Sequence, residues 1–200
     1  MRLILVRHGE TVGNVKSIAQ GHVQGSLTKK GVKQAKLLAE ELKKYKIDVI
    51  YSSDLQRATN TAKIVSKYHK NVKINHTKIL RERSMGIFEN KHMKFVLAHR
   101  ENSKLPRHLW RPPKGESYED IQKRVIKFLE KIKKKHANDT VLFVAHGMVN
   151  RIIIRTLMKK SLRNAHKTEQ ENTCINILES TKNGKFKIKI INYTDHLKNL

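Results

Sequence analysis

Short apolar runs alternate with stretches of helical hydrophobic spacing along this 200-residue chain. The first run, residues 3–6, has the length and composition of a strand buried on both faces, as the strands of parallel sheets are. Further strands are expected at 48–52, 72–75, 141–145, 173–178 and 185–193, and helices at 28–45, 55–68, 117–132 and 149–158. This alternation predicts an α/β fold around a largely parallel sheet.

A turn signal and a long irregular segment stand out between these elements. Asn183-Gly184, between the last two expected strands, favours a hairpin turn, so one of those strands is expected to be an antiparallel edge. Residues 78–115 are the least regular part of the chain and hold its three prolines and its only tryptophan. Such a stretch is more often an excursion over a site than part of a sheet. No repeat or linker divides the chain, which predicts one domain, 1–200, with a lid at 78–115.

The chain is strongly basic: 43 Lys and Arg residues against 17 Asp and Glu give a formal net charge of +26. Such a field attracts polyanions, and nucleic acid is the obvious candidate. The lysines, however, are spread over the whole chain, and the few aromatic residues are not interleaved with them as a stacking platform requires. The composition therefore favours a general surface property, which also suits small anionic substrates, over a dedicated nucleic-acid face.

The lengths of the hydrophobic stretches and the cysteine content indicate the expected cellular compartment. No apolar run approaches the roughly 18 residues of a membrane span, and the apolar start is too short for a secretion signal. Cys174 is the only cysteine, so an internal disulfide is excluded. A cytoplasmic protein without membrane attachment is expected, and its oligomeric state stays open, with a homodimer among the alternatives.

The most informative chemistry lies where two expected strands end. Arg7-His8-Gly9 follows the first strand, and His146-Gly147 follows the strand at 141–145. Ligands of open α/β sheets bind beyond the carboxyl ends of the strands, so both histidines are expected at one rim. A neutral imidazole is available near pH 7, an arginine offers a fork of donors to phosphate, and glycine permits close backbone approach. The pairing suggests chemistry on a phosphate, although an Arg-His-Gly triplet alone is weak evidence among 11 histidines.

Two further charged residues fit that chemistry. Arg57 falls in the first turn of an expected helix, where its cation opposes the helix dipole. A bound anion would relieve this conflict, and an ion pair with Asp54 is the structural alternative. Glu82 lies between Arg81 and Arg83. A general acid needs a pKa raised by burial or a nearby phosphate, and the segment alone favours a salt bridge to one of those arginines.

The chain resembles the histidine phosphatase superfamily, in its phosphoglycerate mutase-like branch. The resemblance spans nearly the full length and rests on five motifs in the same order, which chance explains poorly. They are Arg7-His8-Gly9-Glu10-Thr11 with Asn14, Ser52-Ser53-Asp54-Leu55-Gln56-Arg57-Ala58-Thr59-Asn60-Thr61-Ala62, Leu80-Arg81-Glu82, Gly115-Glu116-Ser117 and His146-Gly147. The resemblance implies a three-layer sandwich with a mostly parallel central sheet, an antiparallel edge strand and helices on both faces.

The resemblance also implies a role for each matching residue. His8 would become phosphorylated. The phosphoryl oxygens would be held by Arg7, Arg57 and His146. Glu82 would protonate the leaving group and later take a proton from the attacking water. Positions near the bound phosphate or substrate match Asn14, Gln20, Gly21 and Gly147, with Thr11 as a further donor. Neither a metal nor a cofactor is implied.

Other phosphate chemistries fit the sequence less well. A cysteine-based phosphatase needs an arginine shortly after its cysteine, and none follows Cys174 within the next six residues. An aspartyl-phosphate enzyme usually carries Asp-x-Asp after its first strand, where this chain has Arg7-His8-Gly9. The sequence has no Gly-x-x-x-x-Gly-Lys-Ser/Thr segment for nucleotide binding. His92 and His99 lack the neighbours that would complete a metal site.

Phosphatases and mutases of this family share the first half-reaction, so the motifs do not separate them. Water discharges the phosphohistidine in a phosphatase, and a hydroxyl of a retained phosphoglycerate does so in a mutase. Glycolytic mutases of this branch carry His-Tyr-Gly and a longer arginine-rich insertion after the acid, where this chain has Arg83-Ser84-Met85-Gly86. A phosphatase for small phosphate monoesters is therefore favoured, with a 2,3-bisphosphoglycerate-dependent mutase as the alternative. Arg107 and Arg111 are candidates to hold a substrate carboxylate or a second phosphate.

The expected partner is a small phosphorylated metabolite, such as a phosphoglycerate, a sugar phosphate or a ribazole phosphate. 2,3-Bisphosphoglycerate would be a cofactor of the mutase alone. A protein that binds nucleic acid through its basic surface and keeps a vestigial site is the alternative from a different class. The complete set of candidate catalytic residues argues against it.

Overall fold

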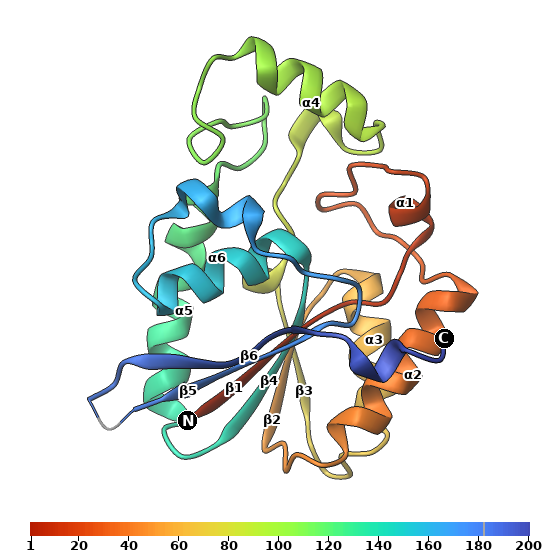
Figure 1. Ribbon diagram of the computed structural model, residues 1–200, viewed down its shortest axis with the longest axis vertical. Helices are drawn as coiled ribbons and strands as arrows, with labels where there is room; N and C mark the ends of the chain where they lie inside the picture. Colours follow the sequence, from red (N-terminus) through yellow and green to blue (C-terminus); the bar gives the residue numbers. More distant parts are fainter. Residues whose placement is uncertain (182) are drawn as a thin grey trace.

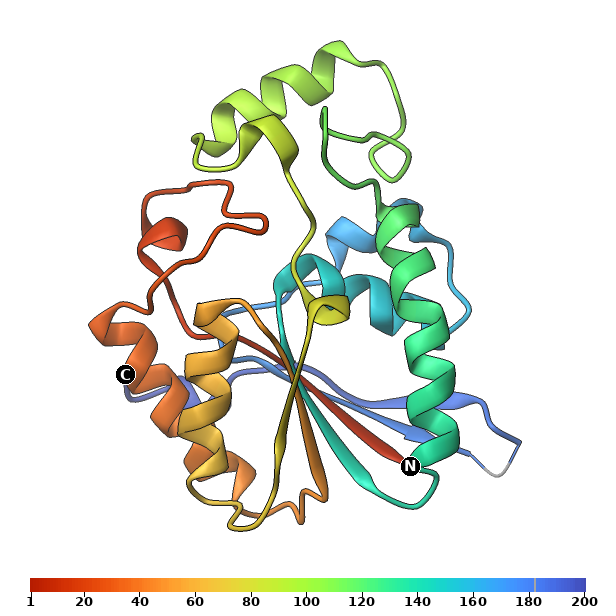
Figure 2. The same cartoon turned by 180° about the vertical axis from the view of Figure 1, so that it is seen from behind.

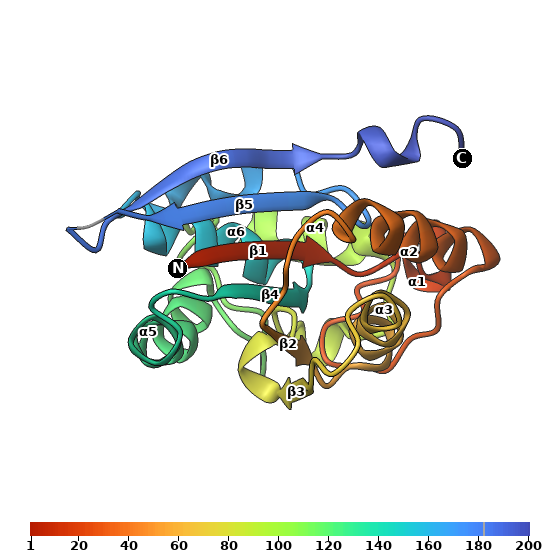
Figure 3. The ribbon, with the colours of Figure 1, turned by 90° about the horizontal axis from the view of Figure 1, so that it is seen from below.

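Alternate residues of the first strand, β1 (Arg2–Arg7), pack into two separate cores, one on each face of the central sheet. The computed structural model describes residues 1–181 and 183–200. Its sheet has six strands in the order β3-β2-β4-β1-β5-β6 (Figure 3). The other strands are β2 (Val49–Ser53), β3 (Ile74–Thr77), β4 (Thr140–Ala145), β5 (Ile175–Ser180) and β6 (Phe186–Tyr193). Burial on both faces explains the unbroken apolar run at the start of the chain.

Strand directions confirm the mostly parallel α/β sheet. β1 pairs in parallel with β4, β4 with β2, and β2 with β3. β5 runs antiparallel to β1, and the edge strand β6 runs antiparallel to β5. The antiparallel pair thus lies at the edge that the Asn183-Gly184 turn predicted.

Helices cover both faces of the sheet (Figures 1 and 2). One face packs against α2 (Lys29–Leu42) and α3 (Gln56–Ser66), and the other against α5 (Tyr118–Lys135) and α6 (Gly147–Leu157). Thr28 caps α2 by accepting from the Gly31 amide, and Ser117 forms a capping box with Asp120 at the start of α5. None of the described helices is long and apolar enough to cross a membrane.

The remaining elements are short and lie mainly outside the layers. They are α1 (Val12–Val15), η1 (Lys78–Leu80), η2 (Gly86–Phe88), α4 (Met93–Asn102), η3 (Leu162–Lys167) and η4 (Asp195–Leu197). The segment 78–115 therefore holds one regular helix, α4, and that helix lies above the end of the sheet where β1 and β4 finish (Figures 1 and 2). Its role as a lid stays a prediction.

Candidate active site

Two adjacent parallel strands bring His8 and His146 together. β1 and β4 are in register through Arg7 and Ala145, so each histidine comes one residue beyond a paired position. The His8 amide donates to the Ala145 carbonyl at 3.1 Å, and the two ring centroids lie 5.1 Å apart at 62°. Both side chains are buried. The expected convergence of the two imidazoles at one rim of the sheet is present.

Hydrogen-bond partners assign different tautomers to the two rings. His8 Nδ1 lies 2.7 Å from the Gly9 carbonyl oxygen, which accepts only, so Nδ1 carries the proton and Nε2 keeps its lone pair. His146 Nδ1 instead accepts from Arg57 Nε at 3.2 Å, so its proton is on Nε2. That nitrogen is buried and has no partner among the described residues. The pair thus offers one nucleophilic nitrogen and one free N–H donor.

Burial and nearby cations keep both imidazoles neutral. Desolvation lowers the pKa of His8 well below its usual value of 6.5, and Arg57 and Arg7 lower it further. The same causes, with His8 as an additional one, lower the pKa of His146. Neutral His8 can therefore act as a nucleophile near pH 7 without a separate base.

Arg57 is held by backbone oxygens and not by Asp54. Its Nη1 and Nη2 donate at 2.8 Å to the carbonyls of Val23 and Gly21. Asp54 pairs with Arg81 at 2.7 and 2.6 Å, which contradicts the alternative pairing with Arg57. Burial lowers the pKa of Arg57 to about 10, so the guanidinium stays charged near neutrality.

Arg7 also lies buried in the site. One end of its guanidinium, Nη1, donates to the Gln170 carbonyl at 2.7 Å. Its Nε is buried and has no partner among the described residues. The neighbouring Gly9 serves packing: a Cβ there would lie 2.4 Å from the Gly31 carbonyl oxygen of α2. The expected use of Gly9, close approach to a ligand, is therefore not what its position requires.

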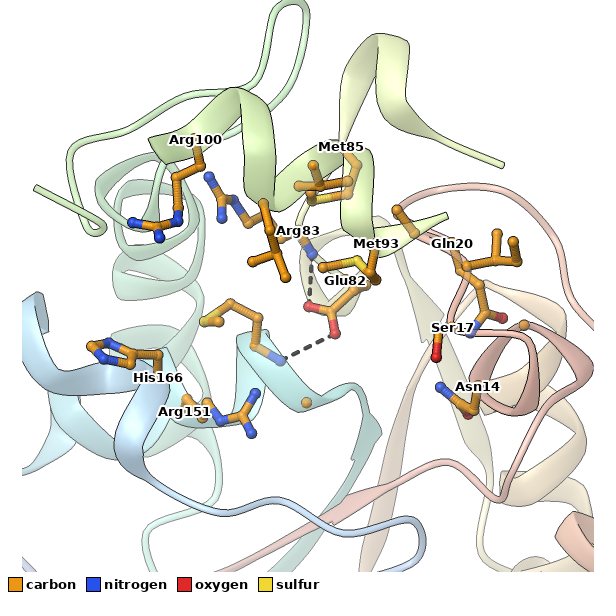
Figure 4. A pocket seen from close by; sticks show the side chains of 18 of the residues that line it. Asn14, Ser17, Gln20, Glu82, Arg83, Met85, Met93, Arg100, Arg151 and His166 are labelled. Carbon is orange, nitrogen blue, oxygen red and sulfur yellow. Dashed lines mark hydrogen bonds between the residues drawn. The ribbon is translucent and has the colours of Figure 1, made fainter. Parts of the chain in front are cut away.

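Glu82 forms no salt bridge to the arginines on either side. Arg81 pairs with Asp54, and Arg83 donates to the carbonyls of Glu116 and Trp110. The Glu82 carboxylate accepts from two backbone amides, those of Arg83 at 2.8 Å and Met148 at 3.1 Å (Figure 4). The salt-bridge alternative is therefore wrong. Because Met148 belongs to the first turn of α6, the carboxylate lies next to the strand end that carries His146.

A cavity of about 550 Å³ opens between the sheet and the segment 78–115. The expected site residues on its wall are Arg7, His8, Asn14, Gln20, Gly21, Arg57, Glu82 and Gly147. His146 lies behind this wall, packed edge-on against His8. No group of three or more His, Cys, Asp or Glu side chains is placed to hold a metal ion within residues 1–181 and 183–200.

Thr11 orients its neighbours and does not line the cavity. Its amide and hydroxyl donate to Asn14 Oδ1 at 3.1 and 2.9 Å, and the hydroxyl also lies 3.1 Å from Gln20 Oε1. With its oxygen engaged in this way, Asn14 has its amide nitrogen available to a ligand (Figure 4). Thr11 therefore does not supply the expected direct contact.

Several cavity residues were not foreseen from the sequence. The basic side chains among them are Arg83, Arg100, Arg151 and His166. Arg151 follows Gly147 by one helical turn, so the predicted helix around 149–158 contained a usable signal. Of the two arginines proposed for a second anion, Arg107 lines the cavity. Arg111 is more than half exposed and pairs with Asp120 at 2.7 Å, so its proposed role is wrong.

Glu89 is a further residue that the sequence analysis did not identify, and its carboxylate joins two loops. Its Oε1 accepts from the amides of His22 at 3.0 Å and Met85 at 3.1 Å. His22 lies in the same loop as the two carbonyls that hold Arg57. Glu89 thus fastens the start of the segment 78–115 to the loop that positions Arg57.

Comparison with known proteins gives one family. The model of the histidine phosphatase superfamily (branch 1) matches residues 3–194. A broad-specificity phosphatase of Saccharomyces cerevisiae is 34% identical over 205 residues, 98% of this chain and 87% of its own length. A metal-independent phosphoserine phosphatase of Arabidopsis thaliana is 34% identical over 165 residues, 80% of this chain and 69% of its own. Phosphoglycerate mutase-like protein 4 of the same plant is 31% identical over 208 residues, 98% and 86% of the two chains.

Solved structures agree with this result. A phosphoserine phosphatase of Entamoeba histolytica, in complex with 3-phosphoglyceric acid, superimposes with a TM-score of 0.86 at 27% identity and covers 98% of both chains. Bacillus stearothermophilus YhfR superimposes with a TM-score of 0.89 at 28% identity, covering 98% of this chain and 99% of its own. The matches extend over nearly the whole fold.

Proposed function

The chain belongs to the histidine phosphatase superfamily, branch 1, and we propose that it hydrolyses small phosphate monoesters through a phosphohistidine formed on His8. The observation that carries this proposal is the pair of tautomers at the sheet rim. The lone pair of His8 Nε2 and the unpartnered N–H of His146 belong to adjacent rings. In the proposed complex, one tetrahedral phosphoryl group meets both.

In the first step, His8 Nε2 attacks phosphorus and the bond to the leaving oxygen breaks. Arg7, Arg57 and the His146 N–H donate to the three phosphoryl oxygens, where negative charge is concentrated. Glu82, in its protonated form, gives its proton to the leaving oxygen, so the alcohol departs neutral. The products are the alcohol and phosphohistidine.

In the second step, water attacks the phosphohistidine. The Glu82 carboxylate takes one proton from that water, and the bond between His8 Nε2 and phosphorus breaks. Inorganic phosphate leaves and Glu82 is again protonated, so the site returns to its starting state. The two amides that hold the carboxylate keep it in one place through both steps.

The proposed reaction needs no metal, because arginines supply the positive charge. Six arginines line the cavity: Arg7, Arg57, Arg83, Arg100, Arg107 and Arg151. The relative named as a metal-independent phosphoserine phosphatase supports this view. A mutase that uses 2,3-bisphosphoglycerate is the second candidate, favoured by the relative named as mutase-like.

Phosphoenzyme trapping tests the proposal. With ³²P-labelled substrate in the presence of EDTA, rapid quenching should trap an acid-labile, base-stable phosphoenzyme. In a separate assay with EDTA, the protein should hydrolyse p-nitrophenyl phosphate. His8→Ala should abolish both. His76→Ala, which removes an exposed histidine on β3, serves as the control and should retain both. Full hydrolysis by His8→Ala would eliminate the proposed nucleophile.

A substrate comparison separates the two candidate reactions. The wild-type protein should release inorganic phosphate from 3-phosphoglycerate or another phosphorylated metabolite without 2,3-bisphosphoglycerate. Formation of 2-phosphoglycerate only when 2,3-bisphosphoglycerate is added would identify the mutase instead.

A further inference from the structure

His22 connects the loop that holds Arg57 with the loop that carries Glu82. Its chain neighbours Gly21 and Val23 provide the two carbonyls that accept from Arg57, each at 2.8 Å. Its ring nitrogen Nε2 lies 2.8 Å from the backbone carbonyl oxygen of Glu82. Resting on the proposed phosphatase activity, we propose that His22 is a positioning residue, whose ring hydrogen bond holds Glu82 in line with the phosphoryl group that Arg57 binds.

The hydrogen bond of the His22 ring has a defined direction. A carbonyl oxygen only accepts, so the proton of this ring is on Nε2. The carboxylate of Glu116 lies 3.8 Å from the same nitrogen, beyond hydrogen-bond distance, and pairs with Arg124 at 2.8 Å. His22 is not one of the described residues that line the cavity. It therefore acts through Glu82 and not on the substrate.

The bond from His22 acts on the peptide unit that also orients the Glu82 carboxylate. The Glu82 carbonyl and the Arg83 amide belong to one planar peptide unit. That amide donates to Glu82 Oε1 at 2.8 Å, and the Met148 amide donates to Oε2 at 3.1 Å (Figure 4). A rotation of the unit would move the carbonyl away from His22 and the amide away from the carboxylate together. The ring hydrogen bond opposes that rotation.

Arg124 supplies a second donor to the same carbonyl. Its Nη2 lies 3.0 Å from the carbonyl oxygen of Glu82 and 2.8 Å from that of Arg81. A carbonyl oxygen has two lone pairs, so His22 and Arg124 together satisfy it. Arg124 comes from α5, whereas His22 comes from the loop that holds Arg57. Of these two donors, His22 is the one that ties the position of Glu82 to that of Arg57.

The turn that carries His22 is held independently of the ring. Its backbone closes through a hydrogen bond of 2.9 Å from the Val23 amide to the Gln20 carbonyl. The His22 amide also donates to Glu89 Oε1 at 3.0 Å. Loss of the ring hydrogen bond should therefore loosen Glu82 and leave the carbonyls of this turn in place.

His22→Met and His22→Gln separate the hydrogen bond from the bulk of the side chain. Met reaches about as far as the ring but ends without a donor, whereas Gln ends in an amide N–H at the position of Nε2. In single-turnover assays, His22→Met should release the alcohol of an alkyl phosphate about 10–100-fold more slowly than the wild type. Release of p-nitrophenol should slow by less than about three-fold, because this leaving group needs little protonation. His22→Gln should bring the alkyl phosphate rate to within about three-fold of the wild type.

A double variant tests whether His22 acts through Glu82. In a Glu82→Gln background, His22→Met should lower the alkyl phosphate rate by less than about two-fold, because the general acid is already absent. The inhibition constant of inorganic phosphate should stay within about two-fold of the wild type in His22→Met, since the carbonyls that hold Arg57 remain in place. His76→Met, the same change at an exposed histidine of β3, is the control and should match the wild type in every assay.

The ¹⁵N NMR shifts of the His22 ring, assigned by their loss in His22→Gln, give a readout that needs no turnover. They should place the ring proton on Nε2, and a proton on Nδ1 would overturn the inference. Equal losses on the two substrates, an additive loss in the double variant, or a His22→Gln rate as low as that of His22→Met would also overturn it.

The phosphohistidine experiment distinguishes failure of this inference from failure of the proposed function. A wild-type protein that forms phosphohistidine on His8 but gives one of the contrary results would lose only the role of His22. A wild-type protein that forms no phosphohistidine would remove the proposed function, and this inference with it.

Discussion

His8 and His146 share a residue type and a strand-end position, yet the structure gives them opposite tautomers. The position of each was predictable, because an apolar run followed by His-Gly marks where a buried strand emerges. The tautomers were not, since they depend on the Gly9 carbonyl in one case and on Arg57 in the other. The same holds for Glu82, whose partners are amides of Arg83 and Met148. The sequence gives the identity of each side chain, whereas its hydrogen-bond partners depend on the tertiary structure.

Glu82→Gln should slow the enzyme in a way that depends on the leaving group. Alkyl phosphates need protonation of the departing oxygen, so their kcat should fall by about 10²–10⁴-fold. p-Nitrophenyl phosphate, whose leaving group departs readily as an anion, should lose much less in its first step. Steady-state and burst kinetics on both substrates measure this. Glu119→Gln, an exposed change of the same charge, should leave both rates intact, and equal losses on the two substrates would argue against a general acid.

Neutral buried histidines should make the fold less stable in acid. The folded-state pKa values of His8 and His146 lie below the unfolded value of 6.5, so the unfolded chain binds more protons as pH falls through 6.5. Stability is therefore complete above that pH and declines below it, by up to about 1.4 kcal/mol per pH unit for each histidine. The decline is measured as the change in the midpoint of urea unfolding between about pH 7.5 and about pH 5. His8→Asn should have a shallower decline, and an unchanged slope would contradict the linkage.

At the scale of elements, the agreement between predicted and observed bounds depends on how deeply each strand or helix is buried. β1 and β4 lie within a residue of their predicted bounds, because burial on both faces leaves a continuous apolar run. β3 was expected at 72–75 but spans Ile74–Thr77, since it pairs only with β2 and carries polar residues. α4 has only a weak hydrophobic pattern because it buries Val96 alone, away from the sheet. Elements that pack weakly carry weak patterns.

Glu89→Gln should lower catalytic activity, although Glu89 lies at the junction of two loops and not among the proposed catalytic residues. The change removes a charged acceptor of the His22 and Met85 amides, which loosens the loop whose carbonyls hold Arg57. We expect kcat to fall about ten-fold, together with a change in the NMR-measured pKa of His146, which touches Arg57. Glu101→Gln, an exposed carboxylate on the same segment, is the control. A lowered melting temperature with an unaltered His146 titration would reduce Glu89 to a purely structural residue.

At the scale of the whole molecule, the formal charge of +26 surrounds a cavity whose wall is also cationic. Exposed lysines occur on several elements, including a row along α5 at Lys127, Lys131 and Lys134. The field of such a surface draws anionic substrates toward the cavity and is screened by salt. Net charge was readable from composition, but which arginines line the cavity could be known only from the fold.

Ionic strength should therefore affect the rate of substrate association more than the rate of the catalytic step. Raising NaCl from about 20 mM to about 200 mM should lower kcat/KM for multiply charged phosphomonoesters several-fold while kcat changes little. Stopped-flow or initial-rate measurements at constant pH decide this. The same titration with duplex DNA tests the alternative of a nucleic-acid surface, for which affinity would fall with a slope of several phosphate contacts.

The order of strands in the sheet has a consequence for biosynthesis. β1 leaves the ribosome before the other strands of the sheet, but its hydrogen-bonding neighbours β4 and β5 come from the last third of the 200 residues. At about 5–20 residues per second, the strand waits on the order of ten seconds for them. During that interval the apolar residues 3–6 lack both neighbouring strands and the covering layer of α5 and α6, which is also synthesised late. The apolar segment that precedes His8 thus stays incompletely paired for longest, and products of premature termination before β5 should aggregate through it.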